Sequence, residues 1–195
     1  MAQPDTPVSL VVGLGNPGRK YAGTRHNAGF WFTDELARRY LASFSNERKF
    51  HGALAKIRCA DREVVLLEPT TYMNHSGRAV QAVASFFKIP AAAILVAHDE
   101  IDLPPGTVRL KRGGGHGGHN GLKDTAKALD SKDFGRLRIG VGHPGHRDDV
   151  IPYVLDSAGR NEQAAIERSI DDAVGAFEHL ARGDWNHAFQ ALHTD

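Results

Sequence analysis

The sequence feature that most constrains the fold is an alternation of short apolar runs with stretches of helical periodicity. Val8–Leu14 is a short apolar, β-branched run closed by glycine, and Ala93–Ala97 is a second apolar run, both typical of buried strands. Apolar residues at helical spacing lie between them, around Phe30–Leu41 and Ala79–Phe87. Alternation of this kind indicates an α/β protein. We expect a three-layer sandwich, with a twisted, mixed β-sheet flanked by helices.

The other expected elements complete one domain over residues 1–195. Further strands are expected at Leu54–Cys59, Val64–Glu68, Val108–Lys111 and Leu137–Val141, and further helices around Leu122–Leu129 and Glu162–Leu180. Residues 60–63 predict a hairpin turn. The expected helix caps are Thr24 or Asn27, Ser76 and Asn120. The helix at Glu162–Leu180 begins an acidic helical tail at about residues 160–195.

Composition excludes several classes of protein. The chain has 195 residues, of which 41% are apolar, so it can bury a core. Its single cysteine excludes an intrachain disulfide framework and a zinc site built from several cysteines. The first ten residues contain no secretory signal pattern, and no apolar run approaches the ~20 residues of a membrane span. We therefore expect a cytoplasmic protein without a membrane partner.

Charge is distributed unevenly along the chain. The net charge is +1, which taken alone argues against a nucleic-acid partner. Residues 107–147, however, carry nine basic and three acidic side chains, whereas residues 148–195 carry three basic and ten acidic ones. A local balance of +6 attracts polyanions even in a neutral molecule, although two opposite surfaces that only aid solubility would give the same count.

The first glycine motif follows the first expected strand. Gly13, Gly15 and Gly18 match G-x-G-x-x-G, the dinucleotide-binding fingerprint. Pro17 lies inside the motif and prevents the helix that a Rossmann site requires there. The motif therefore predicts a glycine-rich turn at the carboxyl end of a strand, where α/β sheets bind ligands.

The second glycine motif, residues 113–121, has six glycines among nine residues and ends at an expected helix N-terminus. Such a loop allows close approach of backbone N–H groups to a ligand. His116 and His119 could suggest a metal site, as could His98 with Asp99. H-x-x-H in a flexible loop lacks the fixed geometry of the helical H-E-x-x-H motif, so a metal site is not favoured.

Polar residues with possible catalytic chemistry occur near ends of the expected elements. His26 could act as a base near neutral pH, and Asp99 could hold a histidine in one tautomer. Asn74 can both donate to and accept from an amide. No G-x-S-x-G motif is present, which argues against a serine nucleophile. Each residue has an ordinary structural alternative, such as capping or surface exposure.

Together these motifs resemble one family. VVGLGNPGRKYAGTRHNAG, PTTYMNHSG, HDEIDLPPG, GGGHGGHNGLKD and RLRIGVGHPG, in this order, are similar to bacterial-type peptidyl-tRNA hydrolases over Val8–Leu155. Tyr72 stands where phenylalanine is more usual in that family. The segment from Asp156 onward resembles the family only as a generic helical tail.

The resemblance implies a function and a set of site residues. The family cleaves the ester between a peptide and the 3′-terminal ribose of tRNA, is typically monomeric, and needs no cofactor or metal. By this resemblance His26 is the catalytic base and Asp99 its orienting partner. The resemblance also implies that the peptide group and water are held by Asn16, Asn74 and Asn120, that the cleft is lined by Tyr21, Met73 and His119, and that tRNA phosphate is bound by Lys111 and Arg138.

Two other functions remain open at this level. A non-catalytic RNA-binding protein with the same fold would bind tRNA without cleaving the ester. A metal-dependent hydrolase would lose activity on treatment with a chelator and regain it with zinc.

Overall fold

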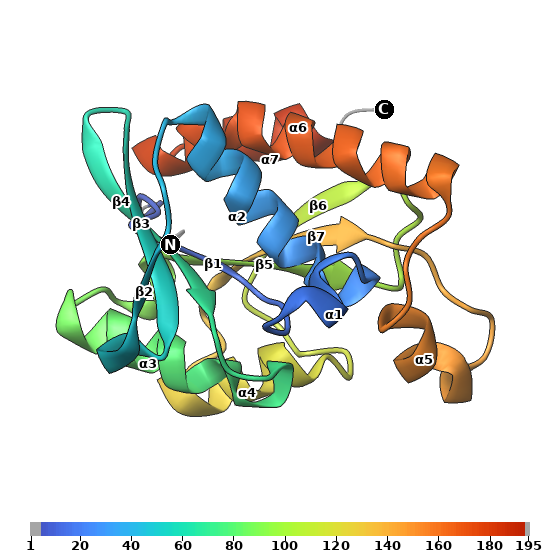
Figure 1. The fold of residues 1–195 in the computed structure, drawn as a ribbon. Coiled ribbons are helices and arrows are strands. Elements are labelled where there is room, and N and C mark those ends of the chain that lie inside the picture. The colour runs from blue at the N-terminus through green and yellow to red at the C-terminus, as the bar shows by residue number, and fades with distance from the viewer. Residues whose placement is uncertain (1–4, 194–195) are drawn as a thin grey trace.

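Seven strands form one mixed β-sheet at the centre of the molecule, which the computed structural model describes over residues 5–193 (Figure 1). The strands are β1 (Leu10–Gly13), β2 (Ser45–Glu47), β3 (Gly52–Cys59), β4 (Arg62–Pro69), β5 (Ile94–Glu100), β6 (Val108–Arg112) and β7 (Gly135–Gly140). Their order is β2-β3-β4-β1-β5-β7-β6. Strands β4, β1, β5 and β7 are parallel, whereas β2, β3 and β6 run antiparallel to their neighbours.

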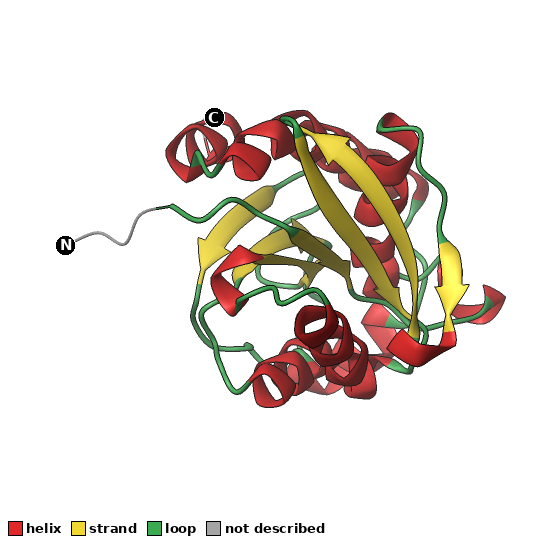
Figure 2. Ribbon diagram, turned by 90° about the vertical axis from the view of Figure 1, so that its left-hand side faces the viewer, coloured by secondary structure: helices red, strands yellow, loops and turns green. Residues whose placement is uncertain are grey.

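Helices cover both faces of this twisted sheet (Figures 1 and 2). They are α1 (Arg19–Ala22), α2 (Ala28–Arg39), α3 (Ser76–Phe86), α4 (Asn120–Leu129), α5 (Val150–Val154), α6 (Arg160–Arg182) and α7 (Trp185–His193). Helices α2, α6 and α7 pack on one face and α3 and α4 on the other, so that two apolar clusters lie on opposite sides of the sheet. The expected three-layer α/β sandwich is confirmed.

The apolar runs that predicted central strands are buried as expected. All four residues of β1 are buried, as are the first six of β5, because each strand has a neighbour on both sides and a helix layer on both faces. The predicted hairpin joins β3 to β4. Its two turn residues, Ala60 and Asp61, have φ of 52° and 59°, the left-handed pair that matches the twist of a two-residue hairpin.

The sequence misplaced several element boundaries. Strand β5 continues through Glu100, so Asp99 lies inside the strand and not after it. The helix expected to reach Leu41 ends at Arg39, and Leu41 has a left-handed φ of 57° and is exposed. Strand β7 ends at Gly140, one residue before the predicted end.

The expected helix caps also differ. His75, and not Ser76, precedes α3, and Ser76 Oγ donates to the carbonyl of Met73. His119, and not Asn120, caps α4 with its side chain. Asn27 does precede α2, but its side chain makes no capping hydrogen bond. The side chains of Ser76 and Asn27 instead bond to backbone groups outside the helices that they were expected to cap.

Among the strands and α-helices, α1, β2 and α5 have no counterpart in the sequence prediction. Helix α6 covers the helix expected at Glu162–Leu180, the chain turns at Gly183, and a separate helix, α7, follows. The first four and last two residues of the predicted domain lie outside the described residues. Among residues 5–193, no helix has the length and apolar character needed to cross a membrane.

Candidate active site

Two of the predicted site residues, Asn16 and Asp99, lie at the carboxyl ends of β1 and β5, which are adjacent parallel strands. Asn16 follows β1, and Asp99 is the penultimate residue of β5. After β1 the chain continues to α2, on one face of the sheet. After β4, which also neighbours β1, it continues to α3, on the opposite face. Connections that diverge in this way leave a crevice where open α/β sheets bind ligands.

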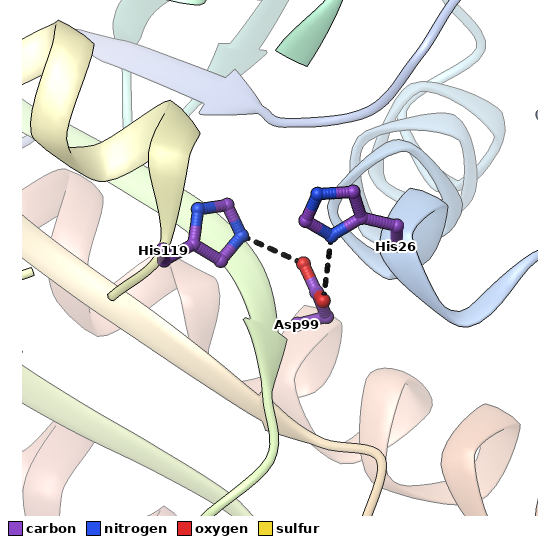
Figure 3. Close-up of side chains that lie close together, drawn as sticks. All are labelled: His26, Asp99 and His119. Carbon is purple, nitrogen blue, oxygen red and sulfur yellow. Dashed lines mark hydrogen bonds and ion pairs between the residues drawn. The ribbon is translucent and has the colours of Figure 1, made fainter. Parts of the chain in front are cut away.

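Asp99 joins two histidines from distant parts of the chain (Figure 3). His26 lies in η1 (Arg25–Asn27), a short 3₁₀ turn that leads into α2. Its Nδ1 lies 2.8 Å from Asp99 Oδ2, and His119 Nε2 lies 2.7 Å from Asp99 Oδ1. Because an ionised carboxylate only accepts hydrogen bonds, both imidazole nitrogens must donate. His26 Nε2 then carries a free lone pair and can take up a proton.

The backbone fixes the tautomer of His119. Its Nδ1 accepts hydrogen bonds from the N–H groups of Gly121, at 3.1 Å, and Leu122, at 3.3 Å, which begin α4. An acceptor nitrogen carries no proton in neutral imidazole, so the proton of His119 lies on Nε2 and points at Asp99. His119 is therefore a hydrogen-bond donor to Asp99 and is unsuited to act as a base in this arrangement.

The environment keeps Asp99 ionised. Burial alone would raise the pKa of Asp99, but the charges of His26 and His119 and their two hydrogen bonds hold it far below its usual range. Burial would lower the pKa of His26, yet the charge of Asp99 and the hydrogen bond to it outweigh burial and raise this pKa above its usual value. An ionised Asp99 thus favours transfer of a proton to His26.

A third histidine, His98, contacts both Asp99 and His119. His98 Nδ1 donates to the backbone carbonyl of Asp99 at 2.8 Å, and its ring lies edge-on to that of His119. Burial, together with the neighbouring His119, lowers the pKa of His98 to about 4, so His98 is neutral near pH 7. Its Nε2 is buried without a hydrogen-bond partner among the described residues.

Within residues 5–193, His26, Asp99 and His119 also form a group that could hold a metal ion, since their ligand atoms lie within 4.8 Å of one another. The chemistry of His119 opposes this use. A metal at His119 Nε2 would move the proton to Nδ1, which already faces two backbone N–H donors. His116 Nδ1 likewise accepts from the N–H of Gly118. The donor set is better suited to hydrogen bonds than to a metal.

Asn16 is part of a rigid buried framework. Asn27 Oδ1 accepts from the backbone N–H of Asn16, and Asn27 Nδ2 donates to its carbonyl, both at 2.9 Å. Asn16 Oδ1 accepts from the N–H of Met73 at 2.7 Å. The side-chain oxygen of Asn16 is therefore occupied. Only its NH₂ group, which has no partner among the described residues, can donate to a ligand.

The structure brings some predicted site residues to one cavity and leaves others outside it. A cavity of about 330 Å³ is lined by His26, Asp99, His119 and Asn120 among those residues. Asn74 is exposed in the turn after β4, and Met73 is buried in the core beside α3 and α4. Tyr21 and Tyr72 form an edge-to-face pair near the surface, with ring centres 6.4 Å apart.

Two further segments complete the cavity. The glycine-rich loop forms one side, and Gly117 and Gly118, with φ of 57° and 83°, adopt the left-handed backbone that glycine accommodates most easily. Helix α5 forms an apolar wall through Val150, Ile151 and Val154. These apolar residues follow no recognisable motif, so sequence reasoning missed them.

The two predicted phosphate-binding residues lie at the β6–β7 edge of the sheet. Lys111 is exposed on β6 and has no ion-pair partner within residues 5–193. Arg138, on β7, donates from Nε to Glu100 at 2.8 Å. Lys111 therefore carries a free charge, whereas that of Arg138 is partly offset by Glu100.

The fold and the site define an α/β protein with a buried carboxylate that orients an imidazole at the carboxyl ends of parallel strands. Comparison with known proteins is consistent with this class. The family model described as peptidyl-tRNA hydrolase matches residues 10–195.

Individual relatives match along almost the whole chain. Proteins named peptidyl-tRNA hydrolase are 59% identical over 185 residues in Halorhodospira halophila, covering 95% of each chain, and 53% identical over 195 residues in Alkalilimnicola ehrlichii, covering 100% of this chain and 99% of the relative. The crystal structure of peptidyl-tRNA hydrolase from Acinetobacter baumannii is 48% identical, covers 95% of this chain and 94% of that chain, and superposes with a TM-score of 0.93. The chain belongs to the peptidyl-tRNA hydrolase family.

Proposed function

We propose that this protein hydrolyses the ester between the peptide and the 3′-terminal ribose of peptidyl-tRNA, with His26 as general base. Membership of the family supports the reaction and its substrate. The observation that carries the role of His26 is its hydrogen bond to the buried, ionised Asp99, which leaves Nε2 free at the cavity. Release of tRNA for reuse follows from the reaction.

The reaction needs no protein nucleophile, because the bond is an activated ester. His26 Nε2 takes a proton from water, and the water oxygen bonds to the ester carbonyl carbon. Asp99 stabilises the imidazolium that forms. The bond from carbon to the ribose oxygen then breaks, and His26 returns the proton to that oxygen.

Amide donors are suited to the charge that develops on the carbonyl oxygen. The free NH₂ of Asn16 is held in place by Asn27 and the backbone of Met73, and preorganised donors stabilise an oxyanion more than mobile ones. Asn120 lines the cavity and Asn74 is exposed in the turn after β4, and we assign both to the peptide group or water.

Recognition of tRNA is assigned to phosphate contacts from Lys111 and Arg138. Contacts of this type are independent of base sequence, so we expect recognition of the end and shape of tRNA and not of its sequence. We also propose that the protein acts as a monomer in the cytoplasm, where translation supplies the substrate. It is proposed to use neither a metal nor an organic cofactor.

The test is hydrolysis of N-acyl-aminoacyl-tRNA by His26→Ala. We expect turnover to fall at least ~100-fold, the low end for loss of a general base, with little change in the affinity for tRNA. His187→Ala, on the exposed surface of α7, is the matched control and should retain full activity. Near-normal turnover of the His26 variant would refute its assignment.

A second comparison tests the alternatives. Free aminoacyl-tRNA lacks the acylated amino group and should be cleaved poorly, because a site built to bind an amide discriminates against a charged ammonium. Addition of a chelator should leave the rate unchanged. Tight tRNA binding without cleavage would favour an RNA-binding protein, and loss of activity restored by zinc would favour metal-dependent hydrolysis.

A further inference from the structure

Arg25, the residue before the proposed base, is a buried arginine without an assigned role. Only 8% of its surface is exposed. Its guanidinium group stacks on the ring of Tyr153, with Cζ 3.8 Å from the ring centre. Arg25 Nη1 also donates to the carbonyl of Tyr153 at 2.8 Å, so Arg25 contacts the end of α5 in two ways.

The same turn is joined to the chain that follows α5. The backbone N–H of Arg25 donates to the carbonyl of Asp156 at 3.0 Å, and Thr24 pairs with Ser157 in an isolated β-bridge. Arg25 Nη2 lies 3.6 Å from Glu162, at the start of α6. Because Glu162 is half exposed, this ion pair contributes little, and the stacking and carbonyl contacts dominate.

Helix α5 has few other attachments. The residues that lead into it, 145–149, are exposed, and α5 lies at the side of the molecule, away from the main helix layers (Figure 1). Tyr153 provides a second anchor, since its hydroxyl donates to the carbonyl of Val141 at 2.7 Å. The position of α5 therefore depends on Tyr153, which Arg25 holds from both the ring face and the backbone.

The position of α5 matters because it forms one wall of the cavity at His26. Val154 is buried, whereas Ile151 is 68% exposed and lines the cavity. An apolar wall opposite polar groups suits the side chain or chain atoms of the acyl group better than a sugar phosphate. Arg25 is thus placed to fix this wall relative to the base, since it adjoins His26 in the same turn.

We propose that Arg25 is a positioning residue, which holds α5 through Tyr153 so that Ile151 contacts the acyl part of the substrate. The inference rests on the proposed function, which places the reacting ester at His26. Arg25 itself contacts neither the substrate nor the reacting atoms. Lysine cannot replace it, because an ammonium group has neither the planar face nor the forked donors of arginine.

The experiment measures kcat and KM on N-acyl-aminoacyl-tRNA for Arg25→Met, Ile151→Ala and the double variant. We expect each single variant to raise KM about tenfold, the range for loss of a few apolar atoms from a pocket, with kcat changed less than about threefold. The double variant should resemble the single ones, because both remove the same contact. Arg25→Lys should not restore KM.

Several controls separate this role from a general loss of structure. Loss of folded protein lowers apparent kcat and leaves KM unchanged, so the split between the two constants is diagnostic. Arg168→Met removes an exposed arginine of α6 and should behave as wild type. If Arg25→Met does not fold, Tyr153→Leu removes the aromatic ring on which Arg25 stacks. It then replaces Arg25→Met in the comparison with Ile151→Ala and the double variant.

The proposal fails if KM is unchanged, if the effects of Arg25 and Ile151 multiply, or if Arg25→Lys restores KM. It also fails if Arg25→Met weakens the affinity for free tRNA by the same factor as it raises KM, since Arg25 would then act on the tRNA. Failure of the assigned role of His26 gives a different result, namely full turnover by His26→Ala, and leaves the KM comparison interpretable. Failure of the proposed function itself gives tRNA binding without ester cleavage by the unmodified protein.

Discussion

At the residue scale, the site depends on one carboxylate that serves two histidines. Asp99 accepts from His26 and from His119, and the N–H groups at the start of α4 fix His119 as a donor. His26 is the member of this cluster that combines a fixed tautomer with a free nitrogen at the cavity. Asp99 raises the pKa of His26 against the effect of burial, so the pH dependence of activity reports on Asp99.

The first prediction concerns this pH dependence. A general base must be neutral, so kcat/KM should rise with pH through the pKa of His26, at a midpoint above about 6.5. Asp99→Asn removes the negative charge that raises this pKa and leaves burial, which lowers it. We expect the midpoint to move to lower pH and turnover to fall at least ~100-fold. A pH–rate series on both proteins measures the shift, and a midpoint that stays in place would contradict the pairing.

At the element scale, close approach between helices positions the loops of the site. A Cβ atom at Gly77, in the first turn of α3, would lie 2.4 Å from the carbonyl oxygen of Asp124 and 2.8 Å from Cβ of Ala128, both in α4. The backbone N–H of Gly77 also donates to Asp124 at 2.8 Å. Helix α4 carries His119 at its N-terminus, so this contact helps to place the donor to Asp99.

The second prediction compares two glycines in helices. Gly77→Ala should lower the free energy of unfolding by about 1–3 kcal/mol, because α3 and α4 must separate to admit the methyl group. Gly175→Ala, at an exposed position of α6 with no atom within 4 Å, should raise it by about 0.5–1 kcal/mol through helix propensity. Urea unfolding of both variants measures the difference. Equal effects at the two positions would argue against the close contact.

At the scale of the whole molecule, the fold separates the charges that the sequence places in consecutive segments. The basic segment, residues 107–147, forms β6, α4 and β7, and α4 covers one face of the sheet. The acidic segment supplies α6 and α7, which cover the opposite face (Figure 1). A net charge of +1 therefore conceals an uneven field that can orient an approaching polyanion.

The third prediction tests this basic side of the molecule. Lys111→Ala should reduce the slope of log K against log salt for tRNA binding by about one, as expected for loss of one phosphate contact. Lys56→Ala, on β3 towards the other edge of the sheet, is the control and should keep the slope. Lys111 gives a cleaner test than Arg138, whose removal would leave Glu100 unpaired. An unchanged slope for Lys111→Ala would remove it from the tRNA contact.

Much of the fold could be predicted from local sequence patterns. The continuous apolar runs at β1 and β5, the two strands of the β3–β4 hairpin and the amphipathic stripe of α6 are set by side-chain periodicity within a few residues. Short elements such as α5 and β2 carry no such signal, because they have too few residues to show a period.

Side-chain periodicity and composition were enough to predict the fold class, the main strands and the charge segments, and the motifs indicated the family, His26 and Asp99. The strand order, the tautomer of His119, the buried framework around Asn16 and the wall formed by α5 became visible in the packed structure. These features depend on contacts between distant residues, such as His26 with Asp99 and Arg25 with Tyr153. Periodicity describes which face of an element is buried, whereas the partner of a polar side chain is fixed only when the whole chain has packed.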